Sequence, residues 1–228
     1  MKKYLFSLLA IVSLGFLVSC STKTNEEKAR ELIEPEIKSN LIKPESYELA
    51  QIKLDSCFSD SQYNPEVLTF AINVAKLYRE YKEFVSDAEK AESSMTIYAP
   101  SYGYQSAHDK QQYKIHKAEM EKAQRRAADK KDQIIKLYKD NKDFLIGMKS
   151  GKLRVGHEFI AWAVTFGYRA ETAGGMKTMG GALYYLNKDM TEIIHRFTED
   201  DMKDMQSTDL QDINYEFEDE LKGIFGEY

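Results

Sequence analysis

The chain has no apolar run long enough to cross a membrane as a permanent helix. Its longest apolar segment, Tyr4 to Phe16, is interrupted by serine and glycine and is shorter than the roughly 20 apolar residues that a spanning helix needs. A short apolar segment at the very start of a chain is instead typical of a leader that is removed.

Cysteine is scarce, and the position of one of the two cysteines is informative. Cys20 follows directly after the apolar segment and the small residue Ser19, and Lys2 and Lys3 lie before that segment. A basic start, an apolar stretch and small residues before a cleavage point form the layout of a bacterial lipoprotein signal. The sequence therefore predicts a signal peptide over residues 1–19, lipidation of Cys20 and a short lipidated tether over residues 20–25.

This prediction places the protein in the cell envelope, anchored to a membrane through its N-terminal lipid. The residues after the cysteine, Ser21 and the pair Glu26–Glu27, are compatible with the outer membrane, on either its periplasmic or its surface face. Because the polar tether is short, we expect the folded body to lie close to the membrane. Once Cys20 carries lipid, Cys57 has no internal disulfide partner, so the fold depends on packing.

The chain also lacks an excess of basic residues. It contains 32 Lys and Arg against 37 Asp and Glu, and removal of the leader with its two lysines changes the formal net charge from −5 to −7. Nucleic-acid binding needs a basic footprint, so we expect no nucleic-acid partner. The 209 residues that follow the leader, 228 minus 19, are enough for one good-sized core or for one domain with a large insertion.

The charges are nevertheless distributed unevenly. Residues 110–142 contain eleven Lys or Arg and five Asp or Glu, whereas residues 199–220 contain ten acidic residues and one lysine. Two interpretations stay open. Both segments are solvated helix faces, or the basic one contacts anionic lipid headgroups, lipopolysaccharide or an acidic partner.

Signatures of common catalytic sites are missing. The four histidines form no pair at i,i+4 and no cluster with cysteine, and the sequence has neither a glycine-rich loop between a strand and a helix nor a G-x-S-x-G turn. Paired carboxylates near the C-terminus are typical of a solvated face. We therefore expect no metal, no cofactor and no enzymatic activity.

Helical and strand periodicities predict an α+β fold, namely a small antiparallel sheet with flanking helices and a long inserted helical hairpin. A capping box at Thr24-x-x-Glu27 opens a helix in which Pro35 is expected to cause a kink or a restart. A strand follows over residues 47–58. We assign the α+β body to residues 26–63 and 150–228.

The insertion, residues 64–149, shows the clearest periodicity. Apolar residues between Val67 and Ala91 alternate in steps of three and four, and a matching pattern runs from Ala107 to Met148. Two long amphipathic helices joined by a short loop favour an antiparallel hairpin. A helix of 30 residues is about 45 Å long, so the hairpin is expected to project from the body as an arm.

After the insertion the pattern indicates three strands, at residues 159–168, 178–186 and 191–197. In the first of these, one face carries large side chains, among them the only tryptophan, Trp162, and is expected to be buried. The opposite face is small, with Ala161, Ala163 and Gly167, and is expected to be packed closely by another segment. A second capping box at Thr208-x-x-Gln211 predicts one last helix.

The candidate binding residues lie at the end of the arm and in the sheet. Tyr98, Tyr102 and Tyr104 surround a proline and a glycine in the loop that joins the two long helices. They either cap the hairpin or form a tip that contacts a protein or a glycan, since tyrosine suits both roles. Within the predicted sheet, Arg169 is the candidate residue for binding a partner.

Three segments carry a resemblance to a known group of proteins. They are Leu41–Glu48 with its Lys-Pro-x-Ser-Tyr-Glu turn, running into Leu54–Phe58; Ile160–Val164 followed by Gly167–Ala170; and Gly181–Asp189. Together they resemble a family of uncharacterised lipoproteins from Bacteroidetes with a C-terminal antiparallel meander. The resemblance implies a common fold and assigns no activity or catalytic residue. The small face at Ala161, Ala163 and Gly167 departs from that pattern.

These observations predict a lipid-anchored envelope protein that is not an enzyme. It is expected to bind an unknown envelope protein or glycan through its helical arm or its sheet. The alternative is a periplasmic immunity or inhibitor lipoprotein that acts against a toxin or a hydrolase.

Overall fold

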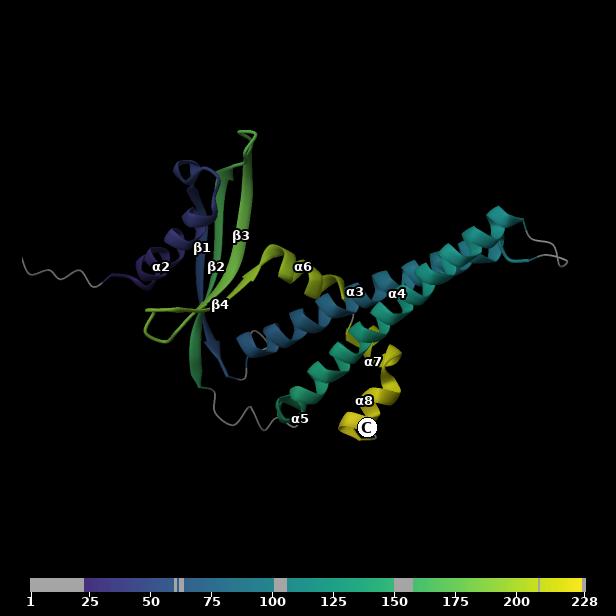
Figure 1. The fold of residues 1–228 in the computed structure, drawn as a ribbon. Helices are drawn as coiled ribbons and strands as arrows, with labels where there is room; N and C mark the ends of the chain where they lie inside the picture. Colours follow the sequence, from purple (N-terminus) through teal and green to yellow (C-terminus); the bar gives the residue numbers. More distant parts are fainter. Residues whose placement is uncertain are drawn as a thin grey trace, which may run out of the picture.

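A computed structural model describes residues 23–59, 61, 64–100, 106–149, 158–208 and 210–226. In these residues the chain forms a four-stranded antiparallel sheet and seven α-helices, and two of the helices make a long hairpin (Figure 1). The predicted α+β class is confirmed.

The first helix, α2 (Asn25–Asn40), begins at the predicted capping box. The Thr24 hydroxyl accepts a hydrogen bond from the Glu27 amide, and the Glu27 carboxylate accepts one from the Thr24 amide. Pro35 lies inside α2 and does not divide it, contrary to the expected restart. Ile33 and Ile37, on either side of Pro35, are both buried against the sheet and hold the helix in place. A short 3-10 turn, η1 (Pro44–Ser46), leads into the sheet.

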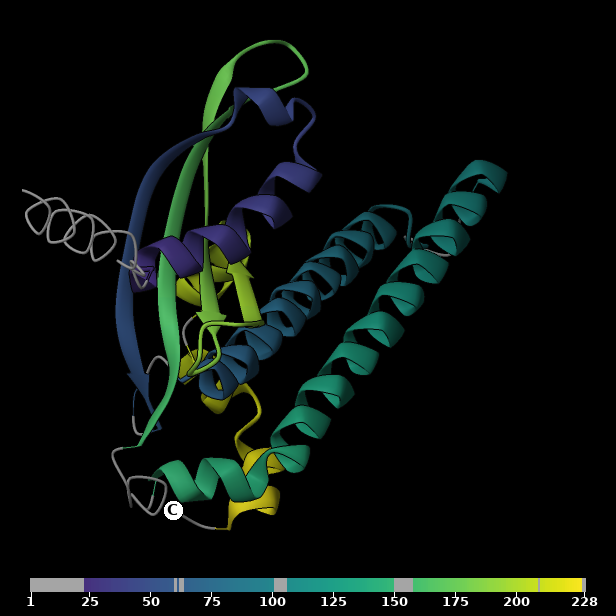
Figure 2. The same cartoon turned by 90° about the vertical axis from the view of Figure 1, so that its left-hand side faces the viewer.

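The sheet has the order β1-β2-β3-β4, formed by β1 (Glu48–Phe58), β2 (Phe159–Glu171), β3 (Lys177–Leu186) and β4 (Ile193–Thr198). Each neighbouring pair is antiparallel. The large face of β2 packs against α2, where Val164 and Phe166 are fully buried with Tyr184. Helix α2 therefore covers one face of the sheet (Figure 2).

The two expectations for the faces of β2 are only partly met. Trp162 packs at the edge of the α2-facing core and is partly buried, with its indole N–H donating a 3.1 Å hydrogen bond to the Lys188 carbonyl. On the small face, Ala161 is buried against the first turns of a long helix, but Thr165 and Arg169 farther along the same face are exposed. The small face is therefore covered at one end only.

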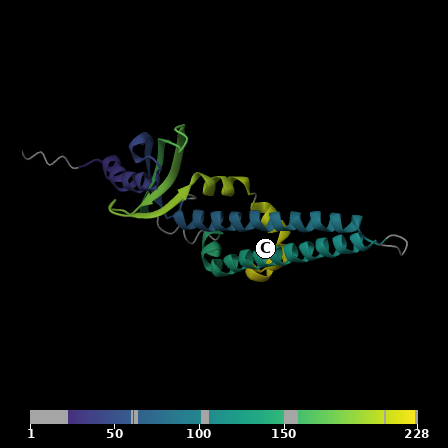
Figure 3. The ribbon, with the colours of Figure 1, turned by 45° about the horizontal axis from the view of Figure 1, so that its top comes forward.

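The hairpin consists of α3 (Pro65–Ile97) and α4 (Ala107–Asp140), which lie side by side and antiparallel (Figures 1 and 3). Asn64 and Ser106 cap their starts with side-chain oxygens. The second predicted helical stretch, 107–148, is two helices, because the chain turns at Asn141 into α5 (Lys142–Lys149). The Asn141 amide N–H and side-chain N–H both bond to the Leu137 carbonyl, which ends α4.

Three short helices follow the sheet where one was predicted. They are α6 (Glu199–Ser207), α7 (Leu210–Glu216) and α8 (Glu218–Phe225). A capping box between Thr198 and Asp201 opens α6 directly from the end of β4. Thr208 lies at the other end of α6, where its hydroxyl donates to the Asp204 carbonyl. The predicted capping role of Thr208 is therefore replaced by a role at the end of the preceding helix.

The C-terminal helices share a hydrophobic core with the hairpin. Ile213 and Phe217 are fully buried among residues of both long helices, including Val74 and Ile134. Ile213, Phe217 and Leu221 are thus buried against the hairpin and not against the sheet. Removal of residues 64–149 would expose this core, so the base of the hairpin and residues 210–226 form one packing unit.

Candidate functional site: the helical arm

The arm is the part of the hairpin beyond its shared core, formed by the distal halves of α3 and α4. Its helices meet along the predicted seam, where Ala88, Ala91 and Ala127 are buried. These small side chains let the two helices approach each other closely. In Figures 1 and 3 no other described element covers this part of the hairpin.

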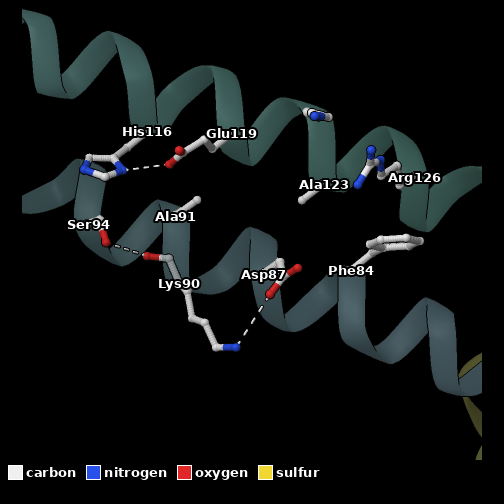
Figure 4. A pocket seen from close by; sticks show the side chains of 10 residues that line it. Phe84, Asp87, Lys90, Ala91, Ser94, His116, Glu119, Ala123 and Arg126 are labelled. Carbon is white, nitrogen blue, oxygen red and sulfur yellow. Dashed lines mark hydrogen bonds and ion pairs between the residues drawn. The ribbon is translucent and has the colours of Figure 1, made fainter.

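Shallow grooves flank the alanine seam on both sides. One has a volume of about 350 Å³ and is lined by side chains of both helices, which Figure 4 shows from close by. Its lining mixes charges of both signs: Asp87 with Lys90 on α3, and Lys122 with Arg126 on α4. The Arg126 guanidinium lies 5.5 Å from the centre of the Phe84 ring, and Lys90 lies 3.6 Å from the Asp87 carboxylate. The groove is open, and its lining residues include no convergent set of catalytic groups.

An aromatic cluster closes the described end of the arm. The Tyr98 ring stacks on the His116 ring with their centres 5.7 Å apart, and it meets the edge of the His108 ring at 6.3 Å. His116 Nδ1 in turn lies 2.9 Å from a Glu119 carboxylate oxygen (Figure 4). Sequence reasoning had not connected these histidines with the tyrosine, since no spacing rule joins residues across a loop. Their contact gives Tyr98 the position of a cap on the hairpin.

The remaining predicted site residues are not part of this cluster. Cys20, Tyr102 and Tyr104 lie outside the described residues. Arg169 is exposed on β2, across the ladder from Glu48 on β1 and Met179 on β3. Lys177, through its hydrogen bond and its charge, and to a lesser degree Arg169 hold the pKa of Glu48 below its usual range. Arg169 therefore belongs to a small surface charge network on the sheet, far from the arm.

The acidic C-terminal segment pairs with the base of the hairpin. Lys76 and Arg79 of α3 bond to Asp201 and Asp204 of α6. On the α7 and α8 side, Lys82 lies 3.3 Å from Glu216, and Lys131 of α4 lies 2.5 Å from Glu220. Most of the basic partners come from α3, and most Lys and Arg side chains of segment 110–142 form no ion pair with another residue that the structure describes.

Three of these carboxylates, Asp201, Glu216 and Glu220, have pKa values below their usual range. Burial by itself would raise the pKa of Asp201, but hydrogen bonds from Lys76 and Thr198 outweigh burial and hold that pKa below its usual range. Burial would likewise raise the pKa of Glu216, and hydrogen bonds from Tyr78, Tyr81 and Lys82 lower it. Burial and Glu216 together raise the pKa of Tyr81 to about 12. These shifts accompany the ion pairs and hydrogen bonds that hold the C-terminal helices against the base of the hairpin.

Two kinds of feature are absent from the described residues. No helix there is both long and apolar enough to cross a membrane. No group of three or more histidine, cysteine, aspartate or glutamate side chains in that part of the chain is arranged to hold a metal ion.

Comparison of the chain with protein-family models, with curated proteins and with solved structures gives no match. The resemblance to Bacteroidetes lipoproteins therefore stays a prediction from the sequence.

Proposed function

We propose that this chain is a lipid-anchored envelope protein whose helical arm binds a partner on the side of the molecule that faces away from the membrane. The proposal joins the lipoprotein-type leader with the direction of the arm. It assigns no catalytic step to the protein.

The direction of the arm is the observation that carries the proposal. The described chain begins at Lys23, next to the start of α2, and α2 lies on one side of the sheet while the hairpin extends from the other (Figures 1 and 3). Cys20 precedes Lys23 by three residues, which span at most about 11 Å. A lipid on Cys20 therefore keeps the membrane close to the α2 side of the body.

The length of the whole hairpin then sets the distance between the end of the arm and that membrane. Helix α3 has 33 residues, which corresponds to about 50 Å. The buried contacts of α7 and α8 with α3 and α4 fix the base of the hairpin, so the arm is a rigid extension and not a loose tether. Such an arm supports binding at a distance from the anchoring membrane.

Site-specific photocrosslinking in intact cells tests the proposal. A photoreactive residue at Ser93, exposed on the distal part of α3, is compared with one at Lys53, exposed on β1. We expect a discrete crosslinked partner from position 93 and none from position 53. Crosslinks from position 53 alone would contradict the role of the arm and move the binding surface to the sheet.

A triple substitution separates the two roles proposed for the tip. If Tyr98, Tyr102 and Tyr104 bind the partner, their joint replacement by serine abolishes the crosslink at position 93 and leaves the melting temperature almost unchanged. If they cap the hairpin, the same change lowers the melting temperature and preserves the crosslink. The stacking of Tyr98 on His116 favours the second result for that residue.

A further inference from the structure

Strand β1 forms one edge of the sheet, and its outer side has no neighbour among the described residues. The strand order β1-β2-β3-β4 pairs β1 with β2 alone, and Figure 2 shows no described element beyond β1. The chain enters β1 from η1, where the Ser46 hydroxyl accepts a 2.8 Å hydrogen bond from the Glu171 amide of β2. It leaves β1 with the Ser59 amide bonded to the Glu158 carbonyl. Both ends of β1 are therefore held toward β2, which leaves the outer edge open.

The open edge contains one regular segment, residues 51–57. The pairing of β1 with β2 is irregular just before and just after this segment, which by itself spans about 23 Å. Proteins protect an exposed edge with proline, with a bulge or with unpaired charges. Residues 51–57 contain no proline, and their two charged side chains, Lys53 and Asp55, neutralise each other at a distance of 2.8 Å. The segment is therefore suited to pairing with another strand.

The order of side chains in this segment is complementary to itself in the antiparallel direction. Leu54 is the midpoint of residues 51–57, so antiparallel pairing about Leu54 pairs the whole segment with the same segment of a second copy. Lys53 of each copy then lies opposite Asp55 of the other. Opposite charges directly across a strand pair stabilise it, whereas like charges destabilise it. Pairing about any other residue of the segment loses these two matches.

The other face of the strand gains apolar contact in the same register. Ile52 and Leu54 are only partly buried against the α2-facing core, and Ser56 on that face is exposed. With Leu54 at the centre, the two Leu54 side chains meet and each Ile52 lies opposite a Ser56. This pairing buries more of both apolar side chains. It also gives hydrogen-bond partners to the backbone groups that point outward from the edge.

The position of the lipid anchors is compatible with a second copy in this orientation. Antiparallel pairing of two identical edge strands is generated by a two-fold axis perpendicular to the sheet. That axis leaves both α2 helices on one face and both hairpins on the other. Under the proposed function the lipid lies on the α2 side, so both copies are anchored in one membrane and both arms extend away from it (Figures 1 and 3). Parallel pairing would place the two anchors on opposite faces.

We propose that the β1 edge binds a second copy of this chain, with residues 51–57 paired antiparallel about Leu54. The two four-stranded sheets then become one continuous sheet. The inference rests on the proposed function for the side on which the anchors lie. It names the chain itself as the partner of the sheet edge and leaves the arms free for an envelope partner.

The mass of full-length protein in excess detergent, measured by light scattering, tests the proposal. We expect the mass of two chains. Lys53→Asp or Asp55→Lys should raise the dissociation constant about tenfold, because each change sets two pairs of like charges opposite each other. Lys203→Asp, on the exposed surface of α6, serves as the control and should change it less than about twofold. Wild-type protein that is monomeric at about 0.1 mM, or equal losses in all three variants, would overturn the proposal.

Mixing the variants separates the interface from effects on the single chain. A Lys53→Asp copy carries two aspartates in the segment and an Asp55→Lys copy carries two lysines, so the two variants are complementary. We expect the equimolar mixture, and likewise the double variant Lys53→Asp/Asp55→Lys, to dimerise within about threefold of the wild type. Failure of both to recover dimerisation would refute the register.

A cysteine at the centre of the segment tests the register directly. Two Leu54→Cys copies place their thiols across one strand pair, with Cβ atoms about 5 Å apart. Ser56→Cys thiols each lie opposite Ile52 and are out of reach of each other. Oxidation of both variants in a Cys57→Ala background should therefore give a disulfide-linked dimer from Leu54→Cys only. Equal yields from the two variants would exclude pairing about Leu54.

The outcome can be distinguished from that of the arm. In the photocrosslinking comparison, a product from position 53 with twice the mass of the chain joins two copies and is not an envelope partner. Monomeric protein whose β1 edge crosslinks to a different protein would overturn the inference in favour of strand addition by that protein. Monomeric protein that still crosslinks from Ser93 would refute the dimer and leave the role of the arm intact.

Discussion

The Tyr78 hydroxyl donates a 2.7 Å hydrogen bond to the Glu216 carboxylate, although 138 residues separate the two in sequence. The bond joins α3, near the base of the hairpin, to α7, and it lies beside the core that contains Phe217. The relationship shows why the C-terminal segment belongs with the hairpin. A polar contact and an apolar core hold the same two elements together.

Two tyrosine-to-phenylalanine substitutions should have opposite consequences. Tyr78→Phe removes a hydrogen bond to a charged acceptor and should lower the free energy of unfolding by about 1–3 kcal/mol. The Tyr184 hydroxyl is buried without a hydrogen-bond partner in the described structure, so Tyr184→Phe should be neutral or stabilising. Denaturant unfolding of the two variants measures the difference. A large loss from Tyr184→Phe would mean that its hydroxyl has a partner.

The shared core should be essential for the stability of the hairpin base. Phe217 is fully buried, whereas Tyr215, two residues earlier, is 85% exposed. Phe217→Ala is therefore expected to cost about 3–5 kcal/mol, while Tyr215→Ala should change stability by less than about 0.5 kcal/mol. Thermal or denaturant unfolding gives both values. Similar small effects from the two substitutions would argue against packing of α7 and α8 on the hairpin.

Stability should fall in acid because Asp201 and Glu216 lose their contacts with α3 when they are protonated. The pKa values of Glu216 and Asp201 are lower in the folded state than their ordinary values of 4.5 and 3.8. Their stabilising contribution is therefore fully present above the ordinary pKa values and is lost as the pH falls through the lowered ones. We expect the free energy of unfolding to decrease below about pH 5.

The substitution Glu216→Gln should make that decrease shallower, since it removes one of the carboxylates whose pKa is lowered in the folded state. Glu89→Gln, which changes an exposed carboxylate of the arm, serves as the control and should leave the pH profile unchanged. Unfolding curves measured between about pH 3 and pH 7 provide the comparison. An unchanged slope in the Glu216 variant would exclude this carboxylate as a contributor.

Lipidation should depend on Cys20 and not on Cys57. Only a thiol at the cleavage point accepts the lipid, so Cys20→Ala should yield an unprocessed or mislocalised precursor. Cys57 is buried in the sheet, with 2% of its surface accessible, and Cys57→Ala should be processed normally. Detergent phase partitioning and the mass of the mature protein report the outcome. A Cys20→Ala protein that matures and partitions with the membrane would refute the predicted anchor.

Periodicity and end signals in the sequence determined the local elements of this protein. The three-and-four spacing from Val67 to Ala91 predicts the long helix α3, and the alternation after Phe159 predicts β2, because a side chain's face follows directly from helical or strand geometry. The Thr24–Glu27 capping box predicted the start of α2 correctly, since both of its hydrogen bonds are local.

Other features depended on contacts between distant segments, which a local pattern does not encode. Thr198 and Thr208 both precede an acid or an amide by three residues, yet of these two only Thr198 opens a capping box in the described residues, whereas the Thr208 hydroxyl donates to the Asp204 carbonyl at the end of α6. Three contacts arise only from the tertiary packing of α3. Its first turns cover the small face of β2 at Ala161, and its end brings Tyr98 onto His116 of α4. Its basic residues Lys76 and Lys82 pair with the acidic C-terminal segment. The sequence determined which faces are apolar or charged, and the tertiary structure decided which of those faces meet and which, as on the outer side of α4, stay open.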